Sequence, residues 1–304
     1  MSARELEDQA PDLRLLSAVV ATLGRLDCLG ACLQALRDSS VPYAEAIVVH
    51  QGDDPAVAAL AERDSARYAR LAVRGLSRAR NHGVALARGT WIFFPDDDCI
   101  PDREFGRTIM RFLAEHPELR FACGRVHDEQ GTVLAPAMGG HTYPIRTRRD
   151  VLRGVVSAGL VVERAALEAV GGFDERLGAG AEFPSGEESD LVFRLLDAGY
   201  PGAYTPAAAV VHAEPYAVRS PQQQTERAYH YGRGWGALLA KHASGAHGHD
   251  ALVLFAEYLA RAAAGAALAA LRGRSADAAR YRASLRGRWR GFHDWRRAIG
   301  AAPC

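Results

Sequence analysis

A short apolar segment that runs directly into three carboxylates carries the most chemical information in this sequence. Residues 91–95 (Trp-Ile-Phe-Phe-Pro) are followed by Asp96, Asp97 and Asp98. Adjacent anions repel one another and are costly to remove from water, so such a cluster persists where it is hydrated or holds a cation. Two carboxylates spaced Asp-x-Asp suit Mg²⁺ or Mn²⁺, and such an ion suits a diphosphate. A solvated acidic turn at the end of a strand is the alternative.

A second acidic cluster follows Gly186 and consists of Glu187, Glu188 and Asp190. Helical periodicity places these residues in the first turn of a helix expected over residues 187–198. The positive end of a helix dipole favours anions, so the cluster is consistent with an ordinary helix start. A functional role for these carboxylates is the alternative. Both interpretations stay open on these residues alone.

The elements that must position these clusters alternate in type along the first part of the chain. Apolar runs predict strands at residues 15–21, 46–49, 71–73 and 91–94, and helical spacing predicts helices at residues 27–37, 55–70 and 77–88. This alternation predicts a parallel sheet covered by helices on both faces. Ligands of such sheets bind beyond the carboxyl ends of the strands. Residues 22–25, 50–54 and 96–98 are therefore expected to converge on one rim.

The second part of the chain is less regular and then becomes entirely helical. Strands are expected at residues 119–126, 155–162 and 207–211, and helices at residues 163–170 and 187–198. After Pro221 the pattern is helical, with a glycine-rich turn expected at residues 232–236. We therefore expect a polar tail at residues 1–13, a catalytic domain at residues 14–220, and a helical, basic region at residues 221–304.

Several motifs between residues 15 and 215, taken in order, resemble those of the family 2 glycosyltransferases of the GT-A type. The segment Val20–Arg25 is similar to the family's opening I-P-T-Y-N-R. Residues 75–83 contain its S-x-A-R-N-x-G helix, residues 87–89 its A-x-G stop, and residues 93–98 its strand with Asp-x-Asp. Further matches are Gly171–Glu175, Gly186–Leu191 with Arg194, and Val210–His212. Each motif is weak to moderate alone, but the ordered combination is highly specific.

The resemblance implies an α/β fold with a Rossmann-like, mixed, mainly parallel sheet flanked by helices and a C-terminal helical appendage. It implies an inverting transfer of a sugar from a nucleotide-diphosphate donor to an acceptor hydroxyl, with Mn²⁺ or Mg²⁺ as cofactor. By position, the nucleotide-sugar contacts would be Thr22, Arg25, Asp53, Arg80, Asp96 and Asp97. The metal ligands would be Asp98, Asp96 and His212. The catalytic base would be Glu188, with Glu187 and Asp190 as alternatives.

Three positions depart from the family pattern. Glu188 stands where the base is usually an aspartate, His50-Gln51 stands where an aspartate usually follows the strand, and Leu23-Gly24 replaces Tyr-Asn. The first departure leaves the base open among three carboxylates. The second leaves the nucleotide open. The sugar and acceptor are open as well, and polysaccharide, glycolipid and glycosylated natural-product pathways all fit such an enzyme.

Composition places the chain among ordinary globular proteins. It has 304 residues, 48% hydrophobic and 24% charged, and a formal net charge of +1, which gives no global field that would favour nucleic acid. The five cysteines form no CxxC pair and are expected to be reduced thiols without a structural zinc. Residues 1–12 are polar and lack the apolar region of a signal peptide. We expect a cytoplasmic protein.

The last part of the chain suggests a second partner. Residues 271–304 contain nine arginines against Asp277 and Asp294. Such a basic region suits an anionic membrane surface at the inner face of a membrane, or a lipid-pyrophosphate acceptor. The alternative is a solvated face, because 36 of the 37 basic residues are arginine and Lys241 is the only lysine. Residues 251–271 are apolar but interrupted by Glu257 and Arg261, which favours a packed or amphipathic helix over a span.

Two other functions share some of these features. A nucleotidyltransferase uses a similar nucleotide-binding half, but the sequence has no glycine-rich basic loop after the first strand to hold a triphosphate. A non-catalytic sugar-nucleotide-binding module would not need both acidic clusters. Residues 127–154, with His141, Tyr143 and four arginines, are either an acceptor loop or a solvated connection.

Overall fold

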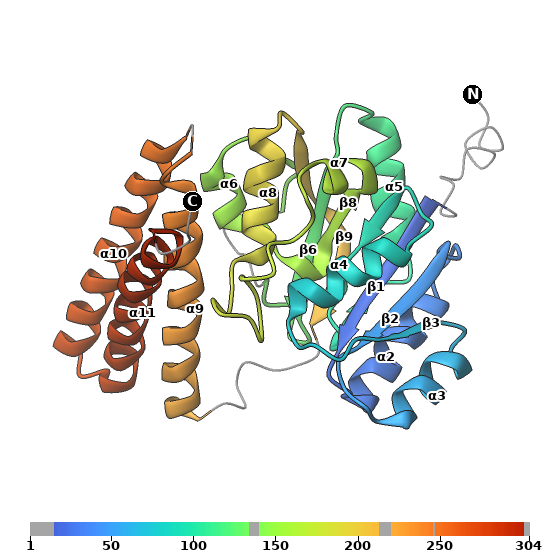
Figure 1. Ribbon diagram of the computed structural model, residues 1–304, viewed down its shortest axis with the longest axis horizontal. Coiled ribbons are helices and arrows are strands. Elements are labelled where there is room, and N and C mark those ends of the chain that lie inside the picture. The colour runs from blue at the N-terminus through green and yellow to red at the C-terminus, as the bar shows by residue number, and fades with distance from the viewer. Residues whose placement is uncertain (1–14, 134–139, 213–219, 246, 301–304) are drawn as a thin grey trace. The chain divides into compact units, whose positions relative to one another are not determined.

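The computed structural model describes residues 15–133, 140–212, 220–245 and 247–300 (Figure 1). The expected polar tail and the last residues of the basic region lie outside this part. The chain divides into two compact units. The first comprises Met1–Arg74, Arg78–Gly172 and Leu191–Pro215, and the second comprises Gly75–Ser77, Phe173–Asp190 and Tyr216–Cys304.

The first unit is built on a mixed sheet. Its strands are β1 (Leu16–Thr22), β2 (Glu45–His50), β3 (Arg67–Arg70), β4 (Trp91–Phe93), β5 (Cys99–Pro101), β6 (Phe121–Asp128), β7 (Tyr143–Ile145), β8 (Leu160–Glu163) and β9 (Gly202–His212). The strand order is β3-β2-β1-β4-β8-β6-β9-β5, and β7 pairs with β9. The strands β3, β2, β1 and β4 are parallel to one another, and β8 runs antiparallel to β4. The expected Rossmann-like fold class is thereby confirmed.

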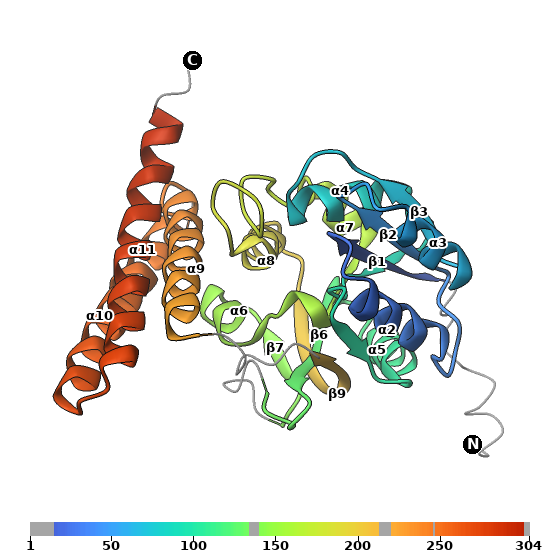
Figure 2. The same cartoon turned by 90° about the horizontal axis from the view of Figure 1, so that it is seen from below.

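Helices cover both faces of this sheet. They are α2 (Leu26–Arg37), α3 (Pro55–Arg63), α4 (Leu76–Leu86), α5 (Phe105–Glu115), α6 (Arg148–Gly154), α7 (Arg164–Ala169) and α8 (Glu187–Asp197), with a 3-10 turn at Ser157–Gly159. Side chains alternate between the faces of a strand. In β1, Ala18 and Val20 share a core with Leu33 of α2, whereas Val19 lies against Gly83 of α4. Figure 2 shows α2 and α5 on one face and α4 and α7 on the other.

Some expected boundaries in the first unit were wrong. The helix expected over residues 55–70 ends at Arg63, and a strand occupies Arg67–Arg70 instead of residues 71–73. Ser65 has a left-handed φ of 57°, which ends the helical path and turns the chain into the strand. The strand β5 and the helix α5 were not predicted. The helix had a readable signal, because Phe105, Ile109 and Leu113 repeat at helical spacing and are buried.

The second unit contains three long helices, drawn in orange to red in Figure 1. They are α9 (Pro221–His242), α10 (Gly248–Leu271) and α11 (Ser275–Gly300). The turn expected at residues 232–236 was wrong, because this segment lies inside α9. A Cβ atom on Gly236 would lie 2.0 Å from the carbonyl oxygen of Arg288, and one on Gly291 of α11 would lie 1.9 Å from that of Arg233. The glycines therefore allow close approach of two helix backbones and do not form a turn.

One helix of the described part, α10, is long and apolar enough to cross a membrane by length and composition, and 28% of its most apolar window is buried. Core helices of soluble proteins meet the same criteria. The exposed apolar side chains of this helix include Leu252, Leu268 and Leu271. The interruptions at Glu257 and Arg261 therefore do not remove its apolar character.

Candidate functional site

The three carboxylates lie where β4 leaves the sheet of the first unit. A parallel bridge pairs Asp96 with Ala21, which places Asp96 beside the carboxyl end of β1. The residues Asp97 and Asp98 are each 5% exposed, and Asp96 is half-buried. This combination of burial and like charge requires positive partners, because an unpaired buried carboxylate is costly.

One group of donors could hold a metal ion. Ligand atoms of Asp96, Asp98, Cys99 and His212 all lie within 4.8 Å of one another. Pairing of β5 with β9 sets Cys99 opposite His212, which brings a residue from the end of β9 to the carboxylates. The Nε2 atom of His212 lies 3.7 Å from Oδ1 of Asp98. Sequence reasoning named three members of this group and missed Cys99, because its only signal was adjacency to Asp98.

The donor set fits the divalent ion that the family implies. Two carboxylates and an imidazole suit Mn²⁺, and the carboxylates also suit Mg²⁺. Burial raises the pKa of the Cys99 thiol well above its usual range, with a smaller contribution from the charge of Asp96. Mn²⁺ and Mg²⁺ prefer oxygen and nitrogen donors to sulfur, so the residues that fit the metal are Asp96, Asp98 and His212.

The middle carboxylate has partners of its own. The hydroxyl of Thr22 donates to Oδ2 of Asp97 at 2.6 Å, and the guanidinium of Arg25 pairs with Asp97 and, at 2.9 Å, with Asp98. Burial lowers the pKa of Arg25, but its hydrogen bonds and charge interactions with these two aspartates outweigh this effect and raise it. Asp97 therefore links the end of β1 to the end of β4, and Arg25 brings positive charge to the cluster.

A second arginine approaches the cluster from α4. The guanidinium of Arg80 donates to Oδ1 of Asp96 at 2.8 Å, and Arg80 is only 1% exposed. Burial of Arg80 in α4, the helix that precedes β4, restricts the rotamers of its side chain and so orders the guanidinium beside Asp96. The structure thus brings together seven of the predicted residues, namely Thr22, Arg25, Arg80, Asp96, Asp97, Asp98 and His212.

The end of β2 is organised differently. His50 is buried, its Nδ1 lies 3.1 Å from the hydroxyl of Tyr68, and burial lowers its pKa, which favours the neutral ring. The side chain of Gln51 donates to the carbonyl of Val73 at 2.7 Å. Asp53 is exposed, and no hydrogen bond or ion pair joins it to the carboxylate cluster within the described residues. The neighbouring Asp54 caps α3 through the amide of Ala56.

The acidic first turn of α8 has its own partners in the second unit. Asp190 is fully buried, and its Oδ1 lies 2.8 Å from Nζ of Lys241 and 2.9 Å from Nε2 of His242. Lys241 also contacts Asp174 at 2.6 Å. Glu187 is buried, whereas Glu188 is half-buried and is the most accessible of the three candidate bases. Sequence reasoning missed the Asp190 pairing. The sequence offered one signal for it, because Lys241 is the only lysine and the other 36 basic residues are arginine.

Comparisons with known proteins identify the family of this chain. The family model described as "Glycosyl transferase family 2" matches residues 17–171. The pre-mycofactocin glycosyltransferase of two Mycobacterium tuberculosis strains is 30% identical over 149 residues, which is 46% of this chain and 30% of that protein. The match thus spans less than a third of the length of those relatives.

Solved structures show the same fold. A mannosyltransferase from Pyrobaculum calidifontis, PcManGT in complex with GDP-Man and Mn²⁺, has a TM-score of 0.62 and 20% identity, covering 94% of this chain and 90% of its own. TarS residues 1–349 from S. aureus has a TM-score of 0.57 and 17% identity, covering 74% and 65%. Because the family model spans half of the chain and these neighbours share its sheet, the chain belongs to glycosyl transferase family 2 and has the GT-A fold.

Proposed function

We propose that the chain is an inverting glycosyltransferase that moves a sugar from a nucleotide-diphosphate donor to an acceptor hydroxyl. The observation that carries this proposal is the group of donor atoms from Asp96, Asp98 and His212, which lie within 4.8 Å of one another beside two arginines. In this proposal residues 14–220 form the catalytic domain, and residues 221–304 are a helical appendage.

The group of ligand atoms from Asp96, Asp98 and His212 indicates how the donor would be bound. When bound, Mn²⁺ or Mg²⁺ would act as a Lewis acid toward the diphosphate that leaves with the nucleotide. Arg80 would hold Asp96 in place, and Arg25 and Thr22 would hold Asp97, so that the carboxylates keep one geometry through the reaction. Asp53, which is exposed after β2, remains our candidate for a contact with the nucleotide base.

The acceptor end needs a carboxylate that takes the hydroxyl proton. We assign this role to Glu188, because Asp190 is already committed to Lys241 and His242, and Glu187 is buried. A positioned general base contributes about 10²–10⁴-fold in rate. Attack from the side opposite the leaving group inverts the anomeric centre, through a transition state of the oxocarbenium type.

Neighbouring structures and the chemistry of transfer suggest the classes of donor and acceptor. Neighbouring structures hold UDP-GlcNAc in TarS and GDP-Man in PcManGT, which supports a nucleotide-diphosphate sugar as donor. A carbohydrate, a lipid-linked sugar or a small molecule would serve as acceptor. We place the enzyme in the cytoplasm, with residues 271–304 as a contact to the anionic inner face of a membrane.

Nucleotide binding tests the proposal directly. Thermal unfolding is followed with UDP, GDP and dTDP, each with and without Mn²⁺. One diphosphate should stabilise the protein only with the metal, and Asp98→Asn should remove this effect. Asp102→Asn is the matched control, because Asp102 is exposed and lies four residues further along. If no diphosphate shifts the wild-type transition, the donor class is wrong; an equal shift without metal would instead reject the metal site.

A further inference from the structure

The second unit contains a cavity whose lining carries an unusual set of charges. Its volume is about 770 Å³, and its walls come from α9, α10 and α11. We name it the arginine–tyrosine cavity after the residues that line it, which include Arg227, Arg261, Arg280, Arg288, Tyr231, Tyr258 and Tyr281. No carboxylate stands among the described lining residues. Arg280 is paired with Asp277, which lies outside the lining. The other three arginines bring like charge to one cavity, so an anion in it would be stabilised.

One of these arginines has an unmet hydrogen-bonding capacity. Arg288 is half-buried, and its Nε has no hydrogen-bond partner among the described residues, whereas Nη1 donates to the carbonyl of Tyr258 at 3.0 Å. Burial also lowers the pKa of this guanidinium. A half-buried guanidinium that no carboxylate of the described residues pairs with costs free energy, and an oxyanion bound beside it in the cavity would supply a counter-charge.

Tyrosine rings lie against the guanidinium groups of three of these arginines. The guanidinium carbons of Arg288 and Arg261 lie 5.2 and 6.0 Å from the ring centroid of Tyr258. The guanidinium of Arg227 lies 4.3 Å from the ring of Tyr231 and donates to its hydroxyl at 2.7 Å. Stacking of this kind fixes a planar fork that matches the oxygen atoms of a phosphate, and it leaves ring surface for an apolar group.

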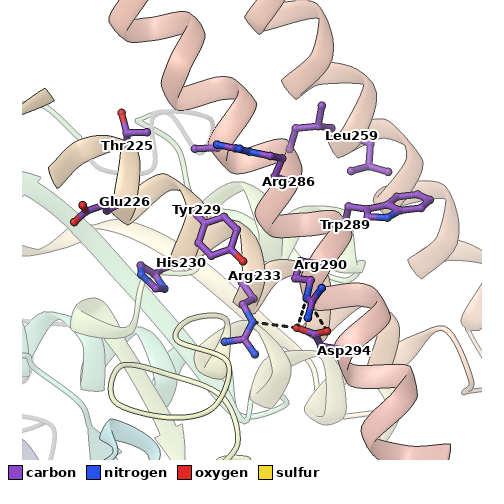
Figure 3. A pocket seen from close by; sticks show the side chains of 12 residues that line it. Thr225, Glu226, Tyr229, His230, Arg233, Leu259, Arg286, Trp289, Arg290 and Asp294 are labelled. Carbon is purple, nitrogen blue, oxygen red and sulfur yellow. Dashed lines mark hydrogen bonds and ion pairs between the residues drawn. The ribbon is translucent and has the colours of Figure 1, made fainter. Parts of the chain in front are cut away.

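A second cavity in the same unit provides a contrast. It has a volume of about 1020 Å³, and Figure 3 shows Arg233 and Arg290 both turned toward Asp294. The two arginines lie 3.4 and 3.0 Å from the carboxylate of Asp294. Glu226 is a second acid in this lining. In this cavity, which we name the Asp294 cavity, a carboxylate of the lining itself pairs with Arg233 and Arg290, so an external anion would gain less stabilisation there.

We propose that the arginine–tyrosine cavity binds a phosphate or diphosphate group carried by an organic molecule. The volume is in the usual range of small-molecule sites, roughly 300–1,000 Å³. The phosphoryl oxygens would accept from Arg288 and Arg261, and the organic part would lie against the tyrosine rings. Either a soluble phosphate ester or a lipid head group offers this chemistry. The site uses residues 224–288 only and is independent of the proposed transfer reaction.

Binding to the full chain tests this proposal in buffer that contains EDTA, so that no metal supports diphosphate binding at Asp96 and Asp98. Pyrophosphate and inorganic phosphate are titrated by calorimetry, and flotation is measured with vesicles that contain phosphatidylglycerol. Arg261→Gln should weaken binding about tenfold, because it removes a charged hydrogen bond at an exposed position that folding does not need. Arg286→Gln is the matched control, since Arg286 is exposed and lines the Asp294 cavity.

The outcomes distinguish a soluble phosphate ligand, a lipid head group and the absence of a site. Pyrophosphate or phosphate binding that Arg261→Gln weakens and Arg286→Gln does not would support the site with a soluble ligand. The same pattern in flotation alone would support it with a lipid head group. Failure of all three probes to bind at millimolar concentration would overturn the proposal. Equal losses in the two variants would also overturn it, because they would show attraction to general positive charge.

Discussion

The two acidic clusters of this protein are held by different cationic partners. At the end of β4, the carboxylates meet arginines from distant segments, Arg25 and Arg80, and keep oxygen atoms of Asp96 and Asp98 beside His212. In the first turn of α8, the buried Asp190 is held by Lys241 and His242, and Glu188 is left more accessible. In both clusters one carboxylate, Asp97 or Asp190, pairs with side chains of other segments, and we propose that a neighbouring carboxylate serves the chemistry.

The difference lies in what the available carboxylates can do. Two carboxylates close to an imidazole suit a cation, whereas a single accessible glutamate suits a proton. Each cluster also has one cation that contacts two acids, namely Arg25 with Asp97 and Asp98, and Lys241 with Asp174 and Asp190. Substitutions at these positions test whether the two roles are separate.

Removing a metal-facing carboxylate should have the largest effect. Asp98→Ala should lower metal-dependent transfer by at least about 10²–10³-fold, the typical cost of losing one strong electrostatic contribution in an active site. Initial rates at several Mn²⁺ concentrations measure this loss. Asp102→Ala should retain the wild-type rate. Near-normal turnover by Asp98→Ala would show that the cluster at β4 is structural, like Asp190.

Removing the accessible glutamate should affect transfer but not donor binding. Glu188→Gln should lower kcat by about 10²–10⁴-fold, because the amide cannot accept the hydroxyl proton. Donor affinity, measured by calorimetry, should stay within error of the wild-type value. If this variant transfers sugar normally, the base is Glu187 or Asp190, and the division of roles in α8 is the reverse of the one proposed.

Breaking the buried pair should reduce stability. Lys241→Met removes one cationic partner of the buried Asp190, and we expect the free energy of unfolding to fall by about 1–3 kcal/mol. Urea unfolding monitored by circular dichroism gives this value. Lys241→Arg keeps the charge but not the compact shape, so its loss should be smaller. An unchanged midpoint in Lys241→Met would show that the pair does not hold α8.

The smallest effect should come from the hydroxyl that holds Asp97. Thr22→Val removes one hydrogen bond to a carboxylate that keeps its contact with Arg25, so the loss should be about 1 kcal/mol. Thr22→Ser keeps the hydroxyl and serves as the control. Thermal unfolding of both variants without ligand measures the difference. A loss of transfer without a loss of stability in Thr22→Val would move Thr22 from positioning to substrate contact.

Much of the site could be predicted because it follows local patterns. The apolar run before Asp96 indicated a strand, and the helical motif with Arg80 indicated the preceding helix. The alternation of these elements predicted that Thr22, Arg25 and the aspartates would share one rim, and the contacts among them agree. The short strand β5 and the strand β3 were harder, because runs of three or four residues carry little periodicity.

The sequence by itself determined the elements, their alternation and the residue types at each strand end, because these depend on neighbours along the chain. Only the tertiary structure decided which side chains meet. The register of β5 against β9 brings His212 to Asp98, Lys241 reaches Asp190 across fifty-one positions, and Gly291 lets α11 approach Arg233 of α9. These contacts arise from packing between distant segments, whose geometry no local pattern records.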